Sequence, residues 1–585
     1  MRRSQRFSAA QAAKRMFGED DTSTETSDSS DSDSTEDCEE TADGDINVNE
    51  SNAVQDQDGW RMVQKDEDYF DHAIDSPLNC EIAFDIPENA KEDIEFFVKL
   101  FLTEELFEMI THFTNKRAEV ALAEYDTDPN GELPTRISNW HCASINEIKK
   151  LFGIILCMKL NHKPELRNYW SKNVIYKSDF FSNRSCLSRN RFEELVRFLR
   201  FSDYENLDQD DALTKIRPFL TFVEDKCKNV YVPAKNICVD ESLLLFKGRL
   251  KFRRYVPSKR ARYGILSYCL CESSTGYTWN ILVAAGRIEN ERIMSTLPEN
   301  IQSFTFSEKI VVALLSNLVD KGYHLFVDNF FSSVRLAQYL YEKKTLMTGT
   351  IRHFRGIPQM LKQLHVPEKS HAFCRKDEVL LVKCVDRKKS GLKTLYLVDT
   401  AQNAGTEPHR RILRGGVSQD VEKSHTVLSY NKGMGGVDSR DSSLHPYNMP
   451  RKSFKWFAKL GLHLFHILIK NSWIVFKHCG GELDFLSYQE KVIEVLVLKT
   501  GDGRRSGSAG GRPARNMVES SPNGIYHTPK RLQPRPNRPR PTKRCKVCFR
   551  EGTRKETVFV CSDCPTCPGL CADPCFRKFH LQQNS

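Results

Sequence analysis

Two short apolar runs that each end in aspartate decide how this chain folds. Residues 236–240 read NICVD, and residues 323–328 read YHLFVD. Such a run is typical of a buried strand, and its terminal aspartate places a carboxylate at the edge of a sheet. A third stretch, residues 435–441, reads GGVDSRD and adds Asp438 and Asp441, which share one face if a helix begins there. The set predicts an acidic site on an α/β fold.

The carboxylates of Asp240, Asp328 and Asp438 suit divalent metal. Mg²⁺ prefers oxygen ligands and keeps several waters, so a few carboxylates suffice. Two metals held together activate a nucleophile and stabilise a leaving oxygen at a phosphodiester. The alternative for each aspartate alone is ordinary turn or capping chemistry. Together they indicate a metal-dependent nuclease or strand transferase.

Alternating strands and helices surround these runs. Strands are expected at 237–239, 266–271, 279–284, 323–327 and 346–351, and helices at 307–318 and 333–341. This order predicts an α/β layout with mixed strand pairing. Residues 356–423 are expected to form a β-rich insertion, in which 379–385 and 392–398 pair through a polar turn. Helical spacing of apolar residues at 96–110, 145–158, 191–201 and 452–477 predicts mainly helical parts before and after the α/β region in the sequence.

Charge is distributed unevenly along the 585 residues, whose formal net charge is +9. Residues 19–46 carry thirteen acids and no Lys or Arg, whereas residues 501–544 carry eleven Lys or Arg and two acids. The basic segment favours nucleic-acid contact and nuclear import. The acidic segment is expected to be disordered and solvated. No secretory signal or membrane span is expected, because the most apolar helix, 454–475, is broken by lysines.

A basic segment with interleaved aromatic residues follows the first aspartate. Residues 246–263 hold eight Lys or Arg among Phe and Tyr. Cations attract phosphates, and unpaired bases stack on aromatic rings, so the segment predicts DNA contact. The alternative is a charged hairpin exposed to water. The candidate DNA-binding residues are Lys247, Arg249, Arg253, Arg254, Lys259, Arg260 and Arg262.

The carboxyl-terminal segment is rich in cysteine. Its candidate metal ligands are Cys545, Cys548, Cys561, Cys564, Cys567, Cys571, Cys575 and His580. Paired CxxC units suit tetrahedral Zn²⁺, and without a secretory signal zinc is favoured over disulfides. These eight candidate ligands could hold one ion, or two ions whose ligands interleave along the chain. The spacing does not show which ligands share an ion. A module this short needs metal to fold.

Three blocks give the chain a resemblance to a known family. Asp240-Glu241 with FKGR at 246–249 and YVPSK at 255–259 resembles the first catalytic block of piggyBac transposases. DNFFSS at 328–333 resembles the second, and SYN at 429–431 followed by 435–441 resembles the third. The terminal cysteine-rich module is also similar. Length and layout resemble a domesticated piggyBac transposable-element-derived protein.

The resemblance implies an RNase H-like core in which Asp240, Asp328 and Asp438 are catalytic and Asp441 is a further metal-proximal acid. It implies Mg²⁺ or Mn²⁺ at that site, a homodimer, double-stranded DNA as partner, a nuclear location and insertion at TTAA tetranucleotides. The family's zinc module recognises transposon ends. Ser332 and Ser442 depart from the residues frequent in the family, and neither is a ligand in the chemical interpretation.

These observations predict an RNase H-like α/β core with a β-rich insertion, a flanking helical domain and a small zinc module. The expected domains are disordered acidic 1–92, helical dimerisation and DNA-binding 93–235, core 236–355, insertion 356–423, core 424–450, helical 451–500, basic linker 501–544 and zinc module 545–580. The rival functions are a catalytically silent nuclear DNA-binding regulator and a zinc-dependent, RING-like interaction scaffold.

Overall fold

The computed structural model describes residues 58–65, 67–71, 74, 81–87, 90–126, 140–257, 259, 261–388, 391–412, 418–447, 455–500, 529–532, 541–561, 564, 568–572 and 574–581. The chain divides into two units, residues 1–504 and 505–585. Among the described residues, none of the helices has the length and apolar character needed to cross a membrane.

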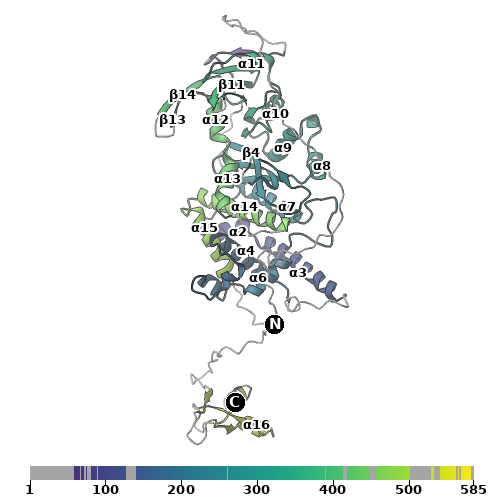
Figure 1. The fold of residues 1–585 in the computed structure, drawn as a ribbon, viewed down its shortest axis with the longest axis vertical. Helices are drawn as coiled ribbons and strands as arrows, with labels where there is room; N and C mark the ends of the chain where they lie inside the picture. Colours follow the sequence, from purple (N-terminus) through teal and green to yellow (C-terminus); the bar gives the residue numbers. More distant parts are fainter. Residues whose placement is uncertain are drawn as a thin grey trace, which may run out of the picture. The chain divides into compact units, whose positions relative to one another are not determined.

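A ten-stranded mixed sheet runs through the first unit (Figure 1). Its strands in spatial order are β1 (Arg61–Val63), β10 (His371–Lys376), β11 (Val379–Lys388), β12 (Gly391–Asp399), β9 (Leu346–Ile351), β8 (His324–Val327), β4 (Asn236–Leu245), β6 (Tyr263–Glu272) and β5 (Arg254–Tyr255), with β7 (Thr278–Val283) paired to β6. β8 is parallel to both β4 and β9, and the other neighbours are antiparallel. The order β7-β6-β4-β8-β9 confirms the mixed core expected of an RNase H-like fold.

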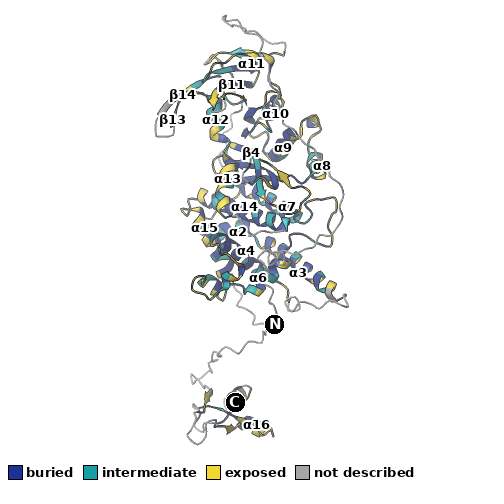
Figure 2. Cartoon of the chain, viewed as in Figure 1, coloured by how far each residue is buried: buried dark blue, intermediate teal, exposed yellow. Residues whose placement is uncertain are grey.

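The central strands β4 and β8 are largely buried where they pair with each other. Ile237, Cys238 and Val239 of β4 are fully buried, and every residue of β8 is buried. Figure 2 shows buried residues concentrated in the core of the first unit and in helices such as α14 and α9. Strands covered on both faces read as continuous apolar runs, which is why the sequence located them. β4 continues beyond the predicted 237–239 to Leu245, because this half pairs with β6.

Helices and short turns connect and cover the core strands. They are α8 (Arg287–Ser295), η3 (Glu299–Ile301), α9 (Phe306–Leu315), η4 (Ser316–Leu318), α10 (Val334–Glu342), α11 (Gln359–Gln363), α12 (His425–Gly433), α13 (Gly436–Leu444) and η5 (His445–Tyr447). α9 and α10 confirm the helices predicted at 307–318 and 333–341. Ser333 caps α10, because its Oγ accepts a hydrogen bond from the Leu336 amide at 3.0 Å.

The β-rich insertion extends the core sheet. β11 and β12 pair from Leu380↔Asp399 to Lys388↔Gly391, which confirms the predicted hairpin. β12 then pairs with β9, so the insertion strands continue the same sheet. A separate antiparallel pair, β13 (Thr406–Ile412) and β14 (Ser418–Ser424), leads into α12.

The described part of the amino-terminal region differs from the disorder expected for residues 1–92. β1 pairs with the outer strand β10, and Trp60 is only 4% exposed. Asp68 binds Arg375 through two oxygens, with Nε–Oδ1 at 2.7 Å and Nη2–Oδ2 at 2.6 Å, and both side chains are fully buried. Composition alone missed this docking because the partners lie more than 300 residues away.

Asp68→Asn should destabilise the first unit by about 3 kcal/mol, because it leaves the buried Arg375 guanidinium without a compensating charge. Thermal unfolding followed by circular dichroism measures the change. Lys65→Ala is the control, since its ion pair with Glu422 is about half exposed and contributes at most about 1 kcal/mol. Equal melting temperatures for Asp68→Asn and the wild type would contradict the prediction.

Helices from both sides of the core gather at one end of the first unit (Figure 1). They are α2 (Ile94–Phe101), α3 (Glu104–Asp126), α4 (Ile145–Leu160), η2 (Leu166–Trp170), α5 (Asp179–Ser182), α6 (Arg189–Phe198), α7 (Arg217–Val230), α14 (Trp456–His478), α15 (Phe485–Ile493) and η6 (Glu494–Leu498). The rings of Phe107, Phe152 and Phe465 pack together and join α3, α4 and α14. β2 (Glu81–Ile82) pairs with β3 (Tyr231–Val232) beside them.

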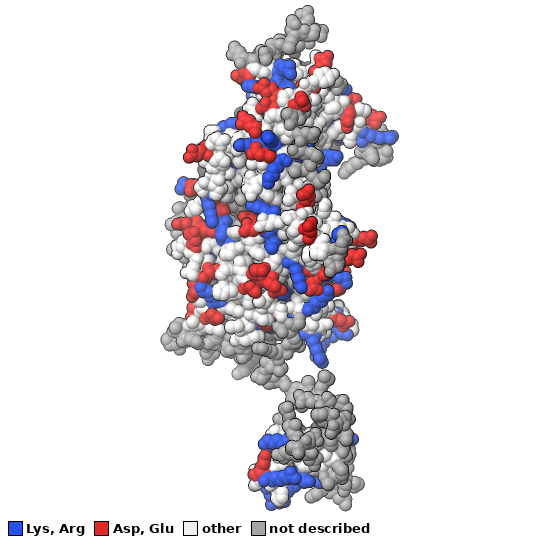
Figure 3. Space-filling model, turned by 180° about the vertical axis from the view of Figure 1, so that it is seen from behind, with Lys and Arg blue, Asp and Glu red and all other residues white. Residues whose placement is uncertain are grey.

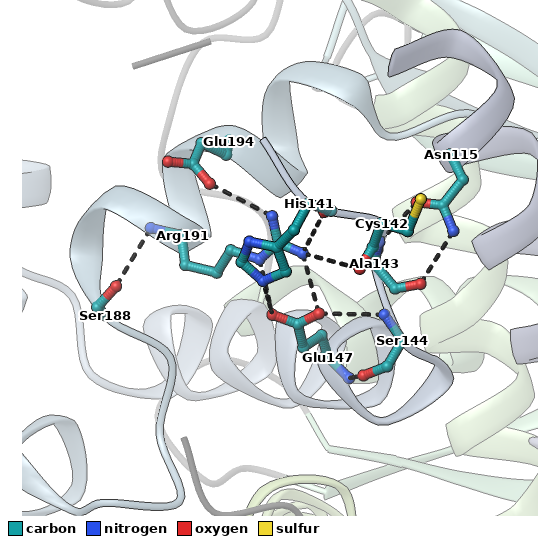
Figure 4. A network of polar contacts seen from close by, with 9 residues as sticks. All are labelled: Asn115, His141, Cys142, Ala143, Ser144, Glu147, Ser188, Arg191 and Glu194. Carbon is teal, nitrogen blue, oxygen red and sulfur yellow. Dashed lines mark hydrogen bonds and ion pairs between the residues drawn. The ribbon is translucent and has the colours of Figure 1, made fainter. Parts of the chain in front are cut away.

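Arg191 joins α6 to the amino terminus of α4 (Figure 4). Its Nε and Nη2 donate to the two carboxylate oxygens of Glu147 at 2.7 and 2.9 Å. Glu147 also accepts from the amide of Ser144, the residue that caps α4. Burial alone would raise the pKa of Glu147, but the hydrogen bonds and charge of Arg191 lower it. This network holds the helical layer together away from the acidic site.

The second unit is small and contains little regular structure. Its elements are β15 (Pro529–Arg531), β16 (Lys543–Arg544), α16 (Lys546–Arg550), β17 (Glu556–Thr557), β18 (Phe559–Cys561) and α17 (Cys575–Leu581). β15 pairs with β18 and β16 with β17, so part of the segment expected to be a linker belongs to this unit.

Candidate active site and metal centres

The parallel pairing of β4 and β8 places Asp240 and Asp328 side by side. Val239↔Val327 is the last matched pair of these strands, and each aspartate is the next residue. Asp240 lies within β4, whereas Asp328 begins a turn in which its Oδ1 accepts from the Phe330 amide at 3.0 Å. Two strands predicted separately thus deliver their carboxylates to one edge of the sheet.

Asp438 comes from α13, which packs against β4 and β6. The close approach depends on Gly436, where a Cβ atom would lie 2.6 Å from the Glu272 carbonyl oxygen and 2.7 Å from Cys238 Sγ. Asp438 is exposed in the first turn of α13, as the glycine-rich stretch predicts. The backbone of Gly436 therefore sets how near this acid comes to the strand acids.

Gly436→Val should displace α13 from β4, reduce any DNA cleavage by at least about tenfold and destabilise the fold by about 1–3 kcal/mol. The side chain would meet backbone and a buried sulfur that have no room to move. Gly435→Ala is the matched control, because nothing lies within 4 Å of a Cβ at that neighbouring position. Melting temperature and cleavage rate measure both effects, and equal behaviour of the two variants would contradict the packing argument.

Asp441 is held by groups of the protein itself. Ser242 Oγ donates to its Oδ2 at 2.7 Å, and Arg440 Nη2 donates to its Oδ1 at 2.7 Å. Burial would raise its pKa, but the charge of the fully buried Arg440 lowers it. Asp441 therefore fixes α13 to β4, and its assignment as a metal-proximal acid stays a prediction.

Burial and mutual repulsion raise the pKa values of several acids at this site. The pKa of Asp240 is raised to about 6, chiefly by burial and also by the charges of Asp328 and Asp438, while Lys259 opposes the rise. Burial also raises the pKa of Asp328 and of Glu241. A divalent cation would relieve such repulsion, so the donor set fits Mg²⁺ or Mn²⁺. The three carboxylates are nevertheless more widely spread than the cysteine ligands, because among the described residues only the two cysteine clusters bring three or more ligand atoms within 4.8 Å.

Several residues that sequence reasoning did not assign to the acidic site lie within its electrostatic reach. Arg352, directly after β9, lowers the pKa of Asp328 against the larger effect of burial. Tyr430 of α12 has a pKa raised by burial and by the charges of Asp328 and Asp240, against a hydrogen bond with Thr350. The sequence indicated the strand that precedes Arg352, but only the pairing of the strands in the folded sheet shows that Arg352 and Tyr430 lie near the acids.

The basic segment of residues 246–263, called the basic hairpin below, carries most of the predicted DNA-binding residues on its surface. Lys247, Arg249, Arg253, Arg254 and Arg262 are exposed. Arg260 lies outside the described residues. On the face drawn in Figure 3, acidic and basic side chains of the first unit are interspersed. The acidic segment 19–46 and residues 501–528 of the basic segment also lie outside the described residues.

Lys259 joins the hairpin to the acidic site. Its Nζ donates to the Glu241 carbonyl oxygen at 3.0 Å, and its charge acts on Asp240 and Asp328. At the other side of the hairpin, the Tyr255 and Tyr263 rings pack 4.6 Å apart. The cations and rings thus begin directly beside the carboxylates.

The second unit groups its cysteines into two clusters. Cys545, Cys548, Cys571 and Cys575 form one, and Cys561, Cys564 and His580 form the other, with ligand atoms within 4.8 Å. Cys545 and Cys548 group with Cys571 and Cys575, which follow the second CxxC unit, and that second unit groups with the still later His580. The ligands of the two clusters therefore interleave along the chain, a pairing that the sequence left open. Cys567 lies outside the described residues. Thiolate and imidazole donors in this arrangement suit Zn²⁺.

Hydrogen bonds orient the ligands of both clusters. His580 Nδ1 lies 2.7 Å from the Phe576 carbonyl oxygen, which turns Nε2 toward Cys564 Sγ at 3.3 Å. Such a bond to the other ring nitrogen is how proteins fix a metal-binding histidine. Burial would raise the pKa of Cys545, but the amides of Cys548 and Cys571 lower it to about 7. The thiolate form that binds metal is therefore favoured at Cys545, whereas burial and the neighbouring thiols raise the pKa of Cys571 and of Cys575.

Comparison with known proteins gives consistent matches. A family model described as "Transposase IS4" matches residues 94–473, and one described as a "DDE_Tnp_1-like zinc finger" matches residues 535–581. PiggyBac transposable element-derived protein 3 of Homo sapiens is 24% identical over 481 residues, which are 80% of this chain and 73% of that protein. PiggyBac transposable element-derived protein 2 of Homo sapiens is 23% identical over 382 residues, 62% of this chain and 61% of that protein. A solved piggyBac transposase synaptic complex with hairpin DNA is 25% identical with a TM-score of 0.57, covering 71% of this chain and 82% of that one.

Proposed function

Because this chain belongs to the piggyBac family of transposases and their domesticated derivatives, we propose that it cleaves DNA and transfers strands at TTAA sites in a divalent-metal-dependent reaction. The observation that carries the proposal is the pairing of β4 with β8, which places Asp240 beside Asp328 at the edge of the sheet that α13 covers. The solved relative holds hairpin DNA, which supports DNA as the partner.

Asp240, Asp328 and Asp438 would hold Mg²⁺ or Mn²⁺ through their carboxylate oxygens. A metal held there would activate a water molecule or a DNA 3′-hydroxyl for attack on phosphorus and would stabilise the departing oxygen. Lys259 and Arg352 offset the negative charge of the acids and would orient the DNA phosphate that lies over them. Ser242 of β4 keeps α13 in place by binding Asp441, and Arg440 of α13 pairs with the same carboxylate.

The remaining parts have supporting roles in this proposal. Lys247, Arg249, Arg253, Arg254 and Arg262 would bind the DNA backbone, and the zinc module with one Zn²⁺ in each cluster would recognise DNA ends. We also propose that the protein acts as a homodimer in the nucleus, as the family resemblance implies.

A plasmid excision assay in cells tests the function. Wild type, Asp328→Asn and Asp320→Asn would be compared on terminal repeats of piggyBac type flanked by TTAA. Asp320 is exposed and has a positive φ of 62°, a conformation that Asn adopts readily, so its variant is a matched control. We expect precise excision by the wild type and Asp320→Asn alone. Silence from all three, with DNA still bound in a gel shift, would favour the catalytically silent regulator.

A further inference from the structure

α14 carries four basic residues on one stripe. Lys459, His463, His466 and Lys470 follow one another at intervals of four, three and four, so they share a face of the helix. Lys459 and His463 are half-buried, whereas His466 is 2% and Lys470 6% exposed. The stripe therefore opens to solvent at its Lys459 end and closes toward Lys470.

The closed end is satisfied by neighbouring side chains. His466 Nε2 lies 2.8 Å from Gln489 Oε1 of α15. Lys470 Nζ lies 4.0 Å from the ring centroid of Trp473 and 4.6 Å from that of Phe485, so aromatic faces stabilise its charge. These two residues have a structural explanation within the protein.

At the Lys459 end of the stripe, the lysine charges have no comparable partners among the described residues. Lys159, from the last turn of α4, is 9% exposed; the charge of Lys459 acts on it, and its own charge acts on His463 and His466. Within the part of the chain that the structure describes, the side chains of Lys159 and Lys459 form neither an ion pair nor a hydrogen bond. Asp441 acts on His463, but Arg440 already binds that carboxylate. Buried charges are normally paired, so the buried and unpaired Lys159 beside the half-buried Lys459 indicates that an anion from outside completes the site.

The basic hairpin contacts the amino-terminal end of α14, near Lys459. Phe252 of the basic hairpin packs edge-on against Trp456 in the first turn of α14, with ring centroids 5.2 Å apart. Lys459 follows one turn later. A nucleic-acid backbone that leaves the acids beside Lys259 and crosses the hairpin would therefore reach the open end of the stripe.

We propose that Lys159 and Lys459, together with His463, bind a phosphate group of the DNA backbone between α4 and α14. The proposal rests on the proposed function, since it takes DNA as the ligand, and it adds a contact outside the acidic site and the basic hairpin. The phosphate would supply the negative charge that the protein does not provide there.

The titration of Lys159 agrees with this geometry. Burial, together with the charge of Lys459, lowers the pKa of Lys159 to about 7. The other charged or titratable groups in this cluster are His463, His466, Lys470, Arg440 and Asp441, which interact with one another or with the two lysines. A bound phosphate favours the charged amine, so DNA binding should be accompanied by proton uptake near neutral pH.

The test uses the full-length protein and a fluorescently labelled DNA duplex containing a TTAA end. Lys159→Met keeps the length of the side chain and removes the unpaired charge. We expect its DNA affinity to fall roughly tenfold and the slope of log affinity against log salt to shrink by about 1. At pH 7 its melting temperature should rise, because a desolvated charge has been removed. Lys459→Met should act in the same direction on affinity.

Lys491→Met is the matched control, because Lys491 is exposed on α15 and already paired with Glu494 at 3.0 Å. Its DNA affinity should equal that of the wild type. A Lys159→Met protein with a raised melting temperature but unchanged affinity and salt slope would overturn the phosphate site while leaving the proposed function intact. A wild type that binds no DNA would overturn both.

Discussion

Asp240→Asn should bind DNA as the wild type does and cleave it at least about a thousandfold more slowly. Asn keeps the shape of the side chain and removes a charge that holds metal, and metal supplies several kcal/mol of transition-state stabilisation. Fluorescence anisotropy measures binding, and a nicking assay measures cleavage. Asp320→Asn serves again as the control.

The same variant should be more stable than the wild type at pH 7. The pKa of Asp240 is about 6 in the folded protein against an ordinary 3.8, so folding favours its protonated form. The stability that the wild type gains from this proton is present below about pH 4 and is lost as pH rises through about 6. Asn has no such loss, so Asp240→Asn should gain up to about 3 kcal/mol at pH 7 and nothing at pH 3. Loss of DNA binding in parallel with cleavage, or a lower melting temperature at pH 7, would contradict this account of Asp240.

Removal of zinc should unfold the second unit and leave the first folded. Structural zinc contributes roughly 10–16 kcal/mol to the folding of small modules, and this one has few other buried groups. A chelator titration followed by circular dichroism should therefore abolish structure in a fragment of residues 529–585 and leave the acidic-site unit with its own melting transition.

Metal analysis of single variants tests the interleaved clusters. The wild type should hold two Zn²⁺ per chain, and both Cys548→Ser and Cys561→Ser should hold fewer, because each disables a different cluster. Cys142→Ser is the control, since Cys142 is exposed and lies outside both clusters. Two ions retained in Cys548→Ser would contradict the ligand grouping.

The core strands were predictable because the local pattern of apolar residues reflects their burial. Strands covered on both faces are apolar throughout, so 237–239 and 323–327 could be located without knowledge of their partners. The hairpin of β11 and β12 was predictable from two alternating runs and a polar turn. The three acids could be proposed because each follows such an element or begins a glycine-led helix.

Other features depend on contacts between distant segments. β1 has only three residues. It forms because it pairs with the outer strand β10 and because Asp68, which follows it, binds the buried Arg375. Arg352 becomes part of the acidic site only through the parallel pairing of β8 and β9. Lys159 reads as an ordinary helix residue in the sequence, and only the packing of α4 near α14 reveals that its charge is unpaired. The pairing of cysteines likewise depended on how the second unit closes.

The most direct test of the central claim is a cleavage assay with purified protein. Wild type and Asp328→Asn would be incubated with a DNA duplex that carries a piggyBac-type terminal repeat flanked by TTAA, with Mg²⁺ or with a chelator. We predict strand cleavage at the TTAA boundary by the wild type with Mg²⁺ only, and intact but bound DNA with Asp328→Asn. Cleavage that survives Asp328→Asn, or bound and uncut DNA with the wild type in Mg²⁺, would contradict a metal-dependent transposase site built on these carboxylates.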